Sequence, residues 1–466
     1  MNDKLLKLRS VLKTMPLNDN QINNILGIID TQNKEINDTI APLLEEYYSY
    51  GIERDYTNSS PNCIRIGNLD LHRSLPIQSK MKGCLLDDDG NVVEYLPEND
   101  WTTATRDGSK GQVMVEIPMH YRKFETKGTK YIVRLSEYPL SGYHQVPKMY
   151  VSAYEASIER SSGKLCSVVN YDIDYRGGNN NIEWDQTYRS LLGRPVTYMD
   201  RSQLRSAARK RNQSNFSWNC YLYHVHKAIF WLYIVEYANF NSQADYNSKL
   251  TLDGFRQGGL GLGVSNFTML EWDTFNKYNP FIPCGYTDTL GNSTGVVAYT
   301  AYNENGSEFK TSNVPRYRGI ENPFGHIGKR TDGINIRISP TEANGGDNLS
   351  KVYICEEDLS KLNDINYNGY KYIGNIFRFN GYTNRIIFGK NGEIIPILTG
   401  GSSTTFFCDY YFTDSSSTER LNSIILGGTA SNDTHNGFIY IDATSLIYEN
   451  NSIGSRLCFI PHKIKK

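Results

Sequence analysis

The sequence predicts an α+β fold in which helices come first and short strands dominate the later part. Three observations support this class. Residues 1–48 carry apolar residues at helical spacing, residues 49–145 alternate short β-favouring runs with turn residues, and residues 146–466 start with a strand, continue with two helices and end in loops and short strands. This order differs from alternating βαβ units. We therefore expect N-terminal helices, a small antiparallel β domain and a larger mixed domain.

A first short helix is expected at the start of the chain. Leu5, Leu8, Leu12 and Met15 form one amphipathic stripe. Pro16 ends this helix, because its ring clashes with a continuing helix.

A second helix is expected from about Asn18 to residue 48. Its apolar residues recur every seventh position, with others beside them: Ile22, Ile29, Ile36 and Leu43, then Ile25, Leu26, Ile40 and Tyr47. Such a repeat is typical of a coiled coil. Gln32 and Thr39 interrupt the second seam, and Pro42 is expected to kink or end the helix near its last turn. The segment is therefore either an oligomerising helix or a helix packed on its own domain.

Residues 49–145 predict short antiparallel strands. β-favouring runs occur at 64–66, 113–115 and 131–135. The acidic stretch from Asp87 to Asn91 superficially resembles a calcium loop, but Val92 stands at the sixth position, where such a loop needs glycine. A hairpin turn at Asp89-Gly90 is the better interpretation.

The larger domain is predicted to begin near residue 146. Residues 149–158 form a strand pattern, and residues 202–211 form a short helix that Ser202 can cap. Residues 222–239 form a second helix that is apolar almost all round and should be buried. A long stretch rich in glycine, asparagine and tyrosine follows, with short strands only.

The composition favours a binding protein and excludes several other classes. The formal net charge is −1, which argues against a protein that grips phosphate backbones, so no nucleic-acid partner is expected. No run of 18 apolar residues occurs, so no membrane insertion is expected. The chain has 34 Tyr and 39 Gly, and antibody-type binding surfaces use the same residue types with Asn and Ser. Composition therefore indicates a binding surface without naming its ligand.

The cysteines and the N-terminus bear on metal binding and compartment. The eight cysteines are scattered without a close pair, so we expect buried free thiols, no zinc site and no cofactor. The first residues contain no apolar stretch of the kind found in secretory signals, so none is expected.

Two motifs that suggest ligand chemistry have simpler interpretations. The glycine-rich segment 258–263 lacks the Gly-Lys-Ser/Thr of a phosphate loop and the strand of a dinucleotide fold, which favours a structural loop. His224 and His226 lie two apart on a helix and so point to different faces, which disfavours a metal site.

Charged motifs give no catalytic assignment either. A basic run at the second short helix is expected to be a solvated face with acidic partners: Arg201, Arg205, Arg209, Lys210 and Arg211. His326 lies near Glu321 and Asp332, but no nucleophile stands in a recognisable elbow. We therefore predict no catalytic residue and no enzyme activity.

Several stretches, in this order, resemble one family. They are Val146-Pro147-Lys148-Met149-Tyr150-Val151 with Tyr154-Glu155-Ala156, Leu191-Leu192-Gly193-Arg194-Pro195-Val196-Thr197, residues 231–238 with Asn241-Ser242-Gln243, Arg316-Tyr317-Arg318-Gly319 through Gly325-His326-Ile327, and residues 427–429, 436–438 and 451–458. Together they resemble the C-type-lectin-like domain of the formylglycine-generating type, as in retroelement-diversified variable proteins of Bacteroidales (crAss-like) phages. The front part resembles the shared N-terminal region of such proteins at residues 65–72 and 83–90.

Three features depart from related families. Gly328, Lys329 and Arg330 stand where members of this family carry Trp and an acidic residue. Cys458 has no apparent partner for the copper site of the enzymes, and the calcium-type sugar motifs of animal lectins are absent. Neither the enzyme activity nor calcium-dependent sugar binding is therefore carried over.

The resemblance implies three segments and a function. Residues 1–48 would attach or oligomerise the protein, residues 49–145 would form the small β domain, and residues 146–466 would form the lectin-like domain, with an insertion at about 341–420. The implied protein is a virion component, a tail or head fibre part made in the bacterial host cytoplasm. It would bind other virion proteins and a host-surface glycan or protein, and would be a homo-oligomer, with a trimer favoured.

The resemblance also implies a ligand-contacting face near the C-terminus. Its candidate residues are Asn432, Asp433, His435, Asn436, Phe438, Tyr440, Tyr448 and Asn450. Aromatic anchors mixed with short amides suit a contact surface, although Phe438 and Tyr440 also fit one buried face of a strand. Two other functions stay open, namely a purely structural docking protein and an enzyme that degrades capsular polysaccharide.

Overall fold

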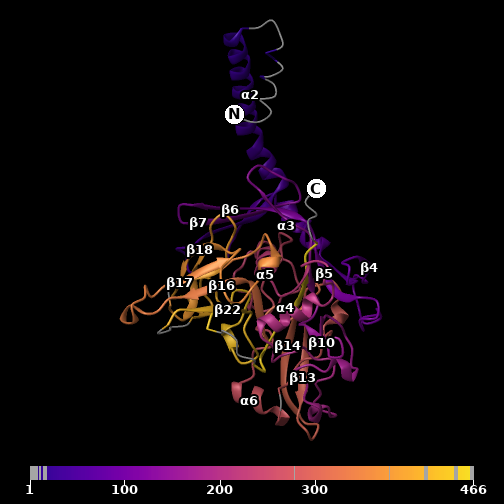
Figure 1. Ribbon diagram of the computed structural model, residues 1–466. Helices are drawn as coiled ribbons and strands as arrows, with labels where there is room; N and C mark the ends of the chain where they lie inside the picture. The colour runs from indigo at the N-terminus through magenta and orange to yellow at the C-terminus, as the bar shows by residue number, and fades with distance from the viewer. Residues whose placement is uncertain are drawn as a thin grey trace.

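The computed structural model has a long helix that rises from a body of antiparallel sheets and short helices (Figure 1). The structure describes residues 9, 12–13, 18–277, 279–376, 378–413, 418–444 and 450–461. Helices and strands are mixed in the α+β manner, which confirms the predicted class. Most of the predicted first helix, including Leu5, Leu8 and Met15, lies outside the described residues.

Helix α2 (Asp19–Tyr48) begins where predicted. Asn18 caps it by accepting a hydrogen bond from the Gln21 amide, and Gln21 returns a bond to the Asn18 amide. The helix continues through Pro42 to Tyr48, so Pro42 does not end it, while the predicted kink there stays a prediction. Pro42 is exposed, and the carbonyl that loses its donor there can bond to water instead.

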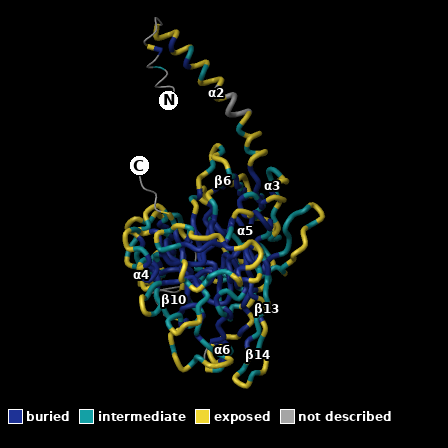
Figure 2. The backbone as a smooth tube through the Cα atoms, turned by 90° about the vertical axis from the view of Figure 1, so that its right-hand side faces the viewer, coloured by how far each residue is buried: buried dark blue, intermediate teal, exposed yellow. Residues whose placement is uncertain are grey.

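Most of α2 does not pack against its own body (Figures 1 and 2). Several apolar side chains on it are largely exposed, including Ile28 at 59%, Leu43 at 66% and Tyr47 at 65%. At the far end of the helix, Ile22 and Leu26 pack against Leu12. Packing of α2 on the body therefore does not explain the apolar residues at either end of the repeat.

The C-terminal end of α2 is anchored to the first sheet. Glu45 pairs with Lys123 at 3.0 Å, and Glu46 lies 3.7 Å from Arg134. This sheet is antiparallel and has the order β2 (Ile64–Gly67), β1 (Tyr50–Asp55), β7 (Lys130–Ser136), β6 (His120–Lys127), β8 (His144–Val146).

A second sheet joins strands from both predicted domains. Its order is β12 (Trp218–Cys220), β25 (Leu457–Phe459), β9 (Met149–Ser152), β5 (Gln112–Ile117), β3 (Lys82–Leu86), β4 (Val92–Tyr95). Strands β3 and β4 form the predicted hairpin, with Gly90 at φ +86° in its turn. The predicted boundary between residues 145 and 146 therefore runs through one continuous sheet, because β5 pairs with β9.

The helices of the body are short except for α5 (Tyr223–Tyr237), which is buried almost completely, as predicted. Helix α4 (Arg201–Arg209) starts one residue earlier than expected, and its cap is Asp200 rather than Ser202. The remaining α-helices are α3 (Leu69–Ser74) and α6 (Met269–Thr274). Single 3-10 turns occur at Gln78–Lys80, Ile173–Tyr175, Ile182–Trp184, Phe275–Lys277, Asp288–Leu290, Glu342–Asn344, Leu359–Lys361 and, as η8, Asp433–His435.

Two small sheets complete the lower half of the body. Strands β10 (Ser157–Glu159) and β11 (Lys164–Cys166) pair, so the strand predicted over 149–158 is split into β9 and β10. Strands β13 (Gly295–Tyr302), β14 (Glu308–Tyr317) and β15 (Ile320–Glu321) form a projecting hairpin with a short third strand.

The insertion predicted at about 341–420 extends a large sheet. The order is β18 (Lys371–Ile376), β17 (Ser350–Ile354), β16 (Gly328–Ile338), β22 (Arg420–Leu426), β23 (Ile441–Asp442), β21 (Tyr410–Phe412), β19 (Gly381–Ile387), β20 (Ile395–Thr399), and β24 (Ile453–Gly454) pairs with β16. The end strands β18 and β20 contact each other, so the sheet curls almost into a closed form.

Thiol burial matches the prediction. All eight cysteines are free, and all but Cys63 are buried. Burial raises the pKa of the Cys63 and Cys84 thiols to about 12, which keeps them protonated and unreactive. Within the described ranges, no helix combines the length and the apolar character that crossing a membrane requires.

Candidate functional site

The β13–β14 hairpin lies at the end of the body opposite α2, as Figures 1 and 2 both show. Two open grooves flank it, and both take residues from the hairpin strands. Loops and hairpin tips held by a rigid core are favoured places for binding sites, because they vary without disturbing the fold.

The first of these, which we call the tyrosine groove, has a volume of about 390 Å³. It is lined by Thr187, Tyr188, Arg189, Ser190, Arg194, Tyr286, Ala298, Tyr299, Thr300 and Tyr302. Its size falls within the range of about 300–1,000 Å³ typical of ligand pockets.

The tyrosine rings form two pairs in this groove. The Tyr286 and Tyr299 rings meet edge to face with centroids 5.0 Å apart, and the Tyr286 hydroxyl donates to the Ala298 carbonyl at 2.8 Å. Tyr188 and Tyr302 lie 6.4 Å apart, and they are 46% and 40% exposed. Burial raises the pKa of Tyr286, so its hydroxyl stays neutral. The groove therefore offers fixed aromatic faces to solvent.

The second, which we call the glycine-loop groove, has a volume of about 410 Å³. It is lined by Asp245, Tyr246, Gly261, Leu262, Gly263, Ser265, Asn266, Val296, Thr311, Ser312 and Asn313. The Gly259 and Gly261 amides donate to the Asp245 and Ala244 carbonyls at 3.1 and 2.9 Å. These amides are therefore not available to a phosphate, and the prediction of a structural loop is confirmed.

Part of the predicted contact segment borders the glycine-loop groove. The Asp433 amide, in η8, donates to the Ser265 carbonyl at 3.1 Å. Asn432 is partly buried and Asp433 is exposed. The His435 ring packs on Tyr410 at 4.2 Å and on Tyr382 at 5.4 Å, and burial lowers its pKa. These three predicted residues are thus close together at the surface.

Three other predicted contact residues are buried, which corrects the expectation for them. Asn436 donates to the Thr429 carbonyl at 2.9 Å, and Phe438 packs against Tyr233 of α5 at 4.8 Å. Tyr440 is 4% exposed. Their segment turns inward because α5 needs an apolar cover. These residues lie beneath the surface, and Phe438 and Tyr440 belong to the buried strand face that was the alternative interpretation.

Asn450 is the remaining predicted residue that the structure describes. Asn450 is exposed and accepts a hydrogen bond from the Ser452 amide at 2.8 Å, so it stabilises a local turn. Tyr448 lies outside the described residues.

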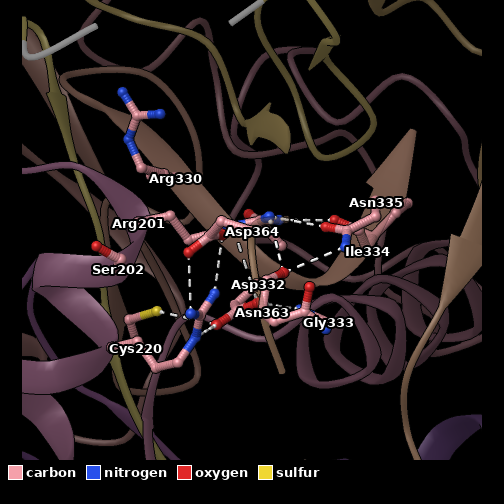
Figure 3. Close-up of polar contacts among 12 residues, drawn as sticks. Arg201, Ser202, Cys220, Arg330, Asp332, Gly333, Ile334, Asn335, Asn363 and Asp364 are labelled. Atoms are coloured by element: carbon pink, nitrogen blue, oxygen red, sulfur yellow. Dashed lines mark hydrogen bonds and ion pairs between the residues drawn. The ribbon is translucent and has the colours of Figure 1, made fainter. Parts of the chain in front are cut away.

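The basic run of α4 is largely an ion network rather than a solvated face, and Figure 3 shows Arg201 of this run beside Asp364. Arg205 pairs with buried Asp332 and, at 2.9 Å, with Asp364 of the insertion, while Arg201 donates to the Asn335 side chain at 2.7 Å. The prediction of acidic partners holds, but the prediction of solvation was wrong for Arg201, Arg205 and Arg211, whose side chains are buried.

A second buried network involves the segment that departs from the family pattern. Lys329 lies 2.9 Å from Glu155, and His326 contacts the same carboxylate. The His326 Nε2 accepts from the Ile282 amide at 3.0 Å, so its Nδ1 carries the proton toward Glu155. Burial lowers the pKa of Lys329 to about 8, although Glu155 opposes the shift. Lys329 therefore forms an internal ion pair with Glu155.

The helical histidines are not arranged as metal ligands. His226 contacts the Phe438 carbonyl and the Tyr221 hydroxyl, and burial lowers the pKa of both His224 and His226 to about 4. In the parts of the chain that the structure describes, no group of three or more His, Cys, Asp or Glu could hold a metal ion.

No protein-family model matches the chain, and no curated protein matches it. The fold and the grooves are therefore the observations from which a function must be argued.

Sequence reasoning did not find the tyrosine groove. Tyr188 and Tyr286 come from loops and Tyr299 and Tyr302 from β13, far apart in the chain. The only available indication was the high tyrosine content, which does not say which rings meet.

Proposed function

We propose that this protein is a phage virion component, a tail or head fibre part, whose body binds a host-surface receptor. One observation carries the proposal: helix α2, which has exposed apolar side chains, and the β13–β14 hairpin lie at opposite ends of the molecule (Figures 1 and 2). Both grooves take lining residues from this hairpin. Such a protein attaches through one end and presents the other end to a cell.

The attachment end is proposed to be homo-oligomeric, with a trimer favoured. Ile40, Leu43 and Tyr47 lie on the seven-residue repeat and are at least 44% exposed. Burial against other copies would remove this apolar surface from water. Several copies would also raise the effective concentration of the receptor-binding ends.

A C-type-lectin-like fold for residues 146–466 is part of the proposal. The segments that carry the family resemblance contact one another. Arg456 donates to the Ser152 and Asn322 carbonyls at 3.1 and 2.7 Å, and the Gly325 amide donates to the Gly427 carbonyl at 2.9 Å. Segments that form one structural unit in the family would have to meet in this way.

The proposal contains no catalytic step. The tyrosine groove is lined by no carboxylate, and the glycine-loop groove is lined by one, Asp245. Glycoside hydrolysis ordinarily needs two carboxyl groups that flank the scissile bond. A binding role therefore fits the two grooves better than degradation of a polysaccharide does.

Binding of the labelled full chain to a panel of Bacteroidales cells tests this function. The wild type should bind host cells, and the double variant Tyr188→Ala, Tyr302→Ala should bind at least about tenfold more weakly, because exposed tyrosines are typical binding hot spots. Tyr372→Ala is the matched control, since Tyr372 is 49% exposed but lies on β18.

Each alternative function predicts a different result in these experiments. A chain found in purified virions that binds no cell of the panel would favour a purely structural docking protein. Release of reducing ends from host capsule would show an enzyme. Equal binding by the groove variant and the wild type would reject the tyrosine groove as the receptor site.

A further inference from the structure

The tyrosine groove has an unusual charge balance. Two guanidinium groups, from Arg189 and Arg194, line it together with tyrosine, threonine, serine and alanine, and no Asp or Glu does. Arg189 lies 3.6 Å from Glu304, which balances one of the two charges. Arg194 therefore decides the net charge of the groove.

Arg194 is held in place without an acidic partner. Its Nε donates to the Phe281 carbonyl and its Nη1 donates to the Leu192 carbonyl, both at 3.0 Å. Within the described ranges, no carboxylate lies within 4.0 Å of its guanidinium. Two carbonyls fix the orientation of the fork but do not neutralise it, so an anion entering the groove meets a positioned cation.

The other lining groups suit a sugar ring better than a peptide. The aliphatic lining is limited to Ala298, so the groove has no apolar pocket to anchor a peptide side chain. It has instead four tyrosine rings, whose negative faces attract polarised C–H groups. The Ser190 hydroxyl already donates to Asp185 at 3.3 Å, and the Thr300 hydroxyl bonds with that of Thr311 at 2.8 Å, but each keeps a lone pair that can accept a hydrogen bond from a sugar hydroxyl.

We propose that the tyrosine groove binds an acidic glycan, in which a carboxylate or sulfate pairs with Arg194 while its sugar ring stacks on the tyrosines. This inference rests on the proposed receptor-binding function and names the class of receptor. The glycine-loop groove differs in charge, since Asp245 lines it and no Lys or Arg does. The acidic ligand therefore belongs to the tyrosine groove alone.

The test compares an acid with its neutral form on the full chain. Hexagalacturonate is the acidic probe, a chondroitin sulfate oligosaccharide is a second one, and methyl-esterified hexagalacturonate is the neutral counterpart. The wild type should bind the acid at least about tenfold more tightly than the ester, because a hydrogen bond to a charged group contributes roughly that factor. Rising salt should weaken the binding of the acid only.

Variants locate the effect at one side chain. Arg194→Gln should bind acid and ester equally, whereas Arg194→Lys, which keeps the charge but not the fork, should keep part of the preference. Arg73→Gln removes an exposed charge on α3 and should change nothing. Each variant should melt as a folded protein, which separates loss of binding from loss of fold.

The test is completed by measuring binding to host cells whose surface carboxylates have been converted to amides. Reduced binding to the amidated cells supports the inference. The inference is overturned if Arg194→Gln retains the preference, if the ester binds as tightly as the acid, or if neither acidic probe binds and amidated cells bind normally. In that last case, continued cell binding leaves the receptor function standing and points to a protein or neutral glycan. Binding of the acidic probe without any cell binding would instead contradict the receptor function.

Discussion

Arg205 of α4 forms a bidentate ion pair with Asp364, with Nη1–Oδ2 at 2.9 Å and Nη2–Oδ1 at 3.0 Å. Asp364 belongs to the insertion, which also contacts α5 through the ion pairs of Lys227 with Glu356 and Glu393. Both parallel hydrogen bonds fix direction as well as distance, since a guanidinium fork matches a carboxylate. The pair therefore sets the position of the insertion against the helix.

Removing this pair should destabilise the protein. We expect Asp364→Asn to lower the free energy of unfolding by about 2 kcal/mol, because the buried Arg205 loses one of its two charged partners and keeps only Asp332. Asp347→Asn is the control, since the Asp347–Lys351 pair is exposed and should contribute about 0–1 kcal/mol. Urea unfolding measures both, and equal effects would refute the structural role of Asp364.

Glu155 should make stability depend on acid pH. Burial alone would raise its pKa, but Lys329 and His326 outweigh it and hold the pKa near about 2 instead of 4.5. Because the folded pKa is lower, this stabilisation is fully present above pH 4.5 and is lost as the pH falls toward 2. Lys329 does not change charge in that range, since its pKa is about 8.

Glu155→Gln provides the measurement for this acid dependence. The variant should be less stable than the wild type at neutral pH, and its stability should fall less steeply between pH 4.5 and 2. Melting curves across this range, with Glu94→Gln as an exposed comparison, record the slopes. Parallel slopes for wild type and Glu155→Gln would show that another group controls acid unfolding.

Helix α2 should determine the oligomeric state of the protein in solution, and therefore its mass. Light scattering of the full chain should give three times the chain mass, and the double variant Ile40→Glu, Leu43→Glu should give one chain, because charges on the apolar repeat repel across a coiled coil. Lys34→Glu, on the exposed polar surface of the helix, should leave the mass unchanged. A wild type of single-chain mass at micromolar concentration would refute oligomerisation through α2.

Gly90 should be irreplaceable for two reasons that can be separated. An added Cβ would lie 2.0 Å from the Phe459 ring, and the residue has φ +86°. Gly128 has φ +58°, but a Cβ there meets nothing within 4 Å. Gly128→Ala should therefore lose about 1 kcal/mol from backbone strain alone, and Gly90→Ala clearly more. Similar losses in urea unfolding would mean that Phe459 moves aside at no cost.

Short sequence patterns were sufficient to predict the features that depend only on neighbouring residues. The apolar content of α5 predicted its burial, and Asn18 marked the start of α2 because capping depends on neighbouring residues only. Gly90 marked the β3–β4 turn for the same reason. These features depend on a few adjacent residues, which the sequence displays directly.

Features that depend on distant partners were not predictable in this way. The density of positive charge on α4 predicted a solvent-exposed face. Asp332 and Asp364, which are distant in the sequence, pair with its arginines in the interior. Alternation at Phe438 and Tyr440 fitted both a contact face and a core face, and the position of α5 decided between them. The tyrosine groove was not predictable for the same reason, because it forms where loops distant in the sequence meet β13.

The pairing of β25 with its neighbours has a consequence for folding. Strand β25 lies between β12 and β9, so residues 457–459 pair with residues 218–220 and 150–151, which are distant in the sequence. Contacts between residues distant in sequence form slowly, because a long loop must close before they are made. The second sheet is therefore expected to be completed late in the folding of the body, and loss of β25 would leave the facing edges of β12 and β9 unpaired.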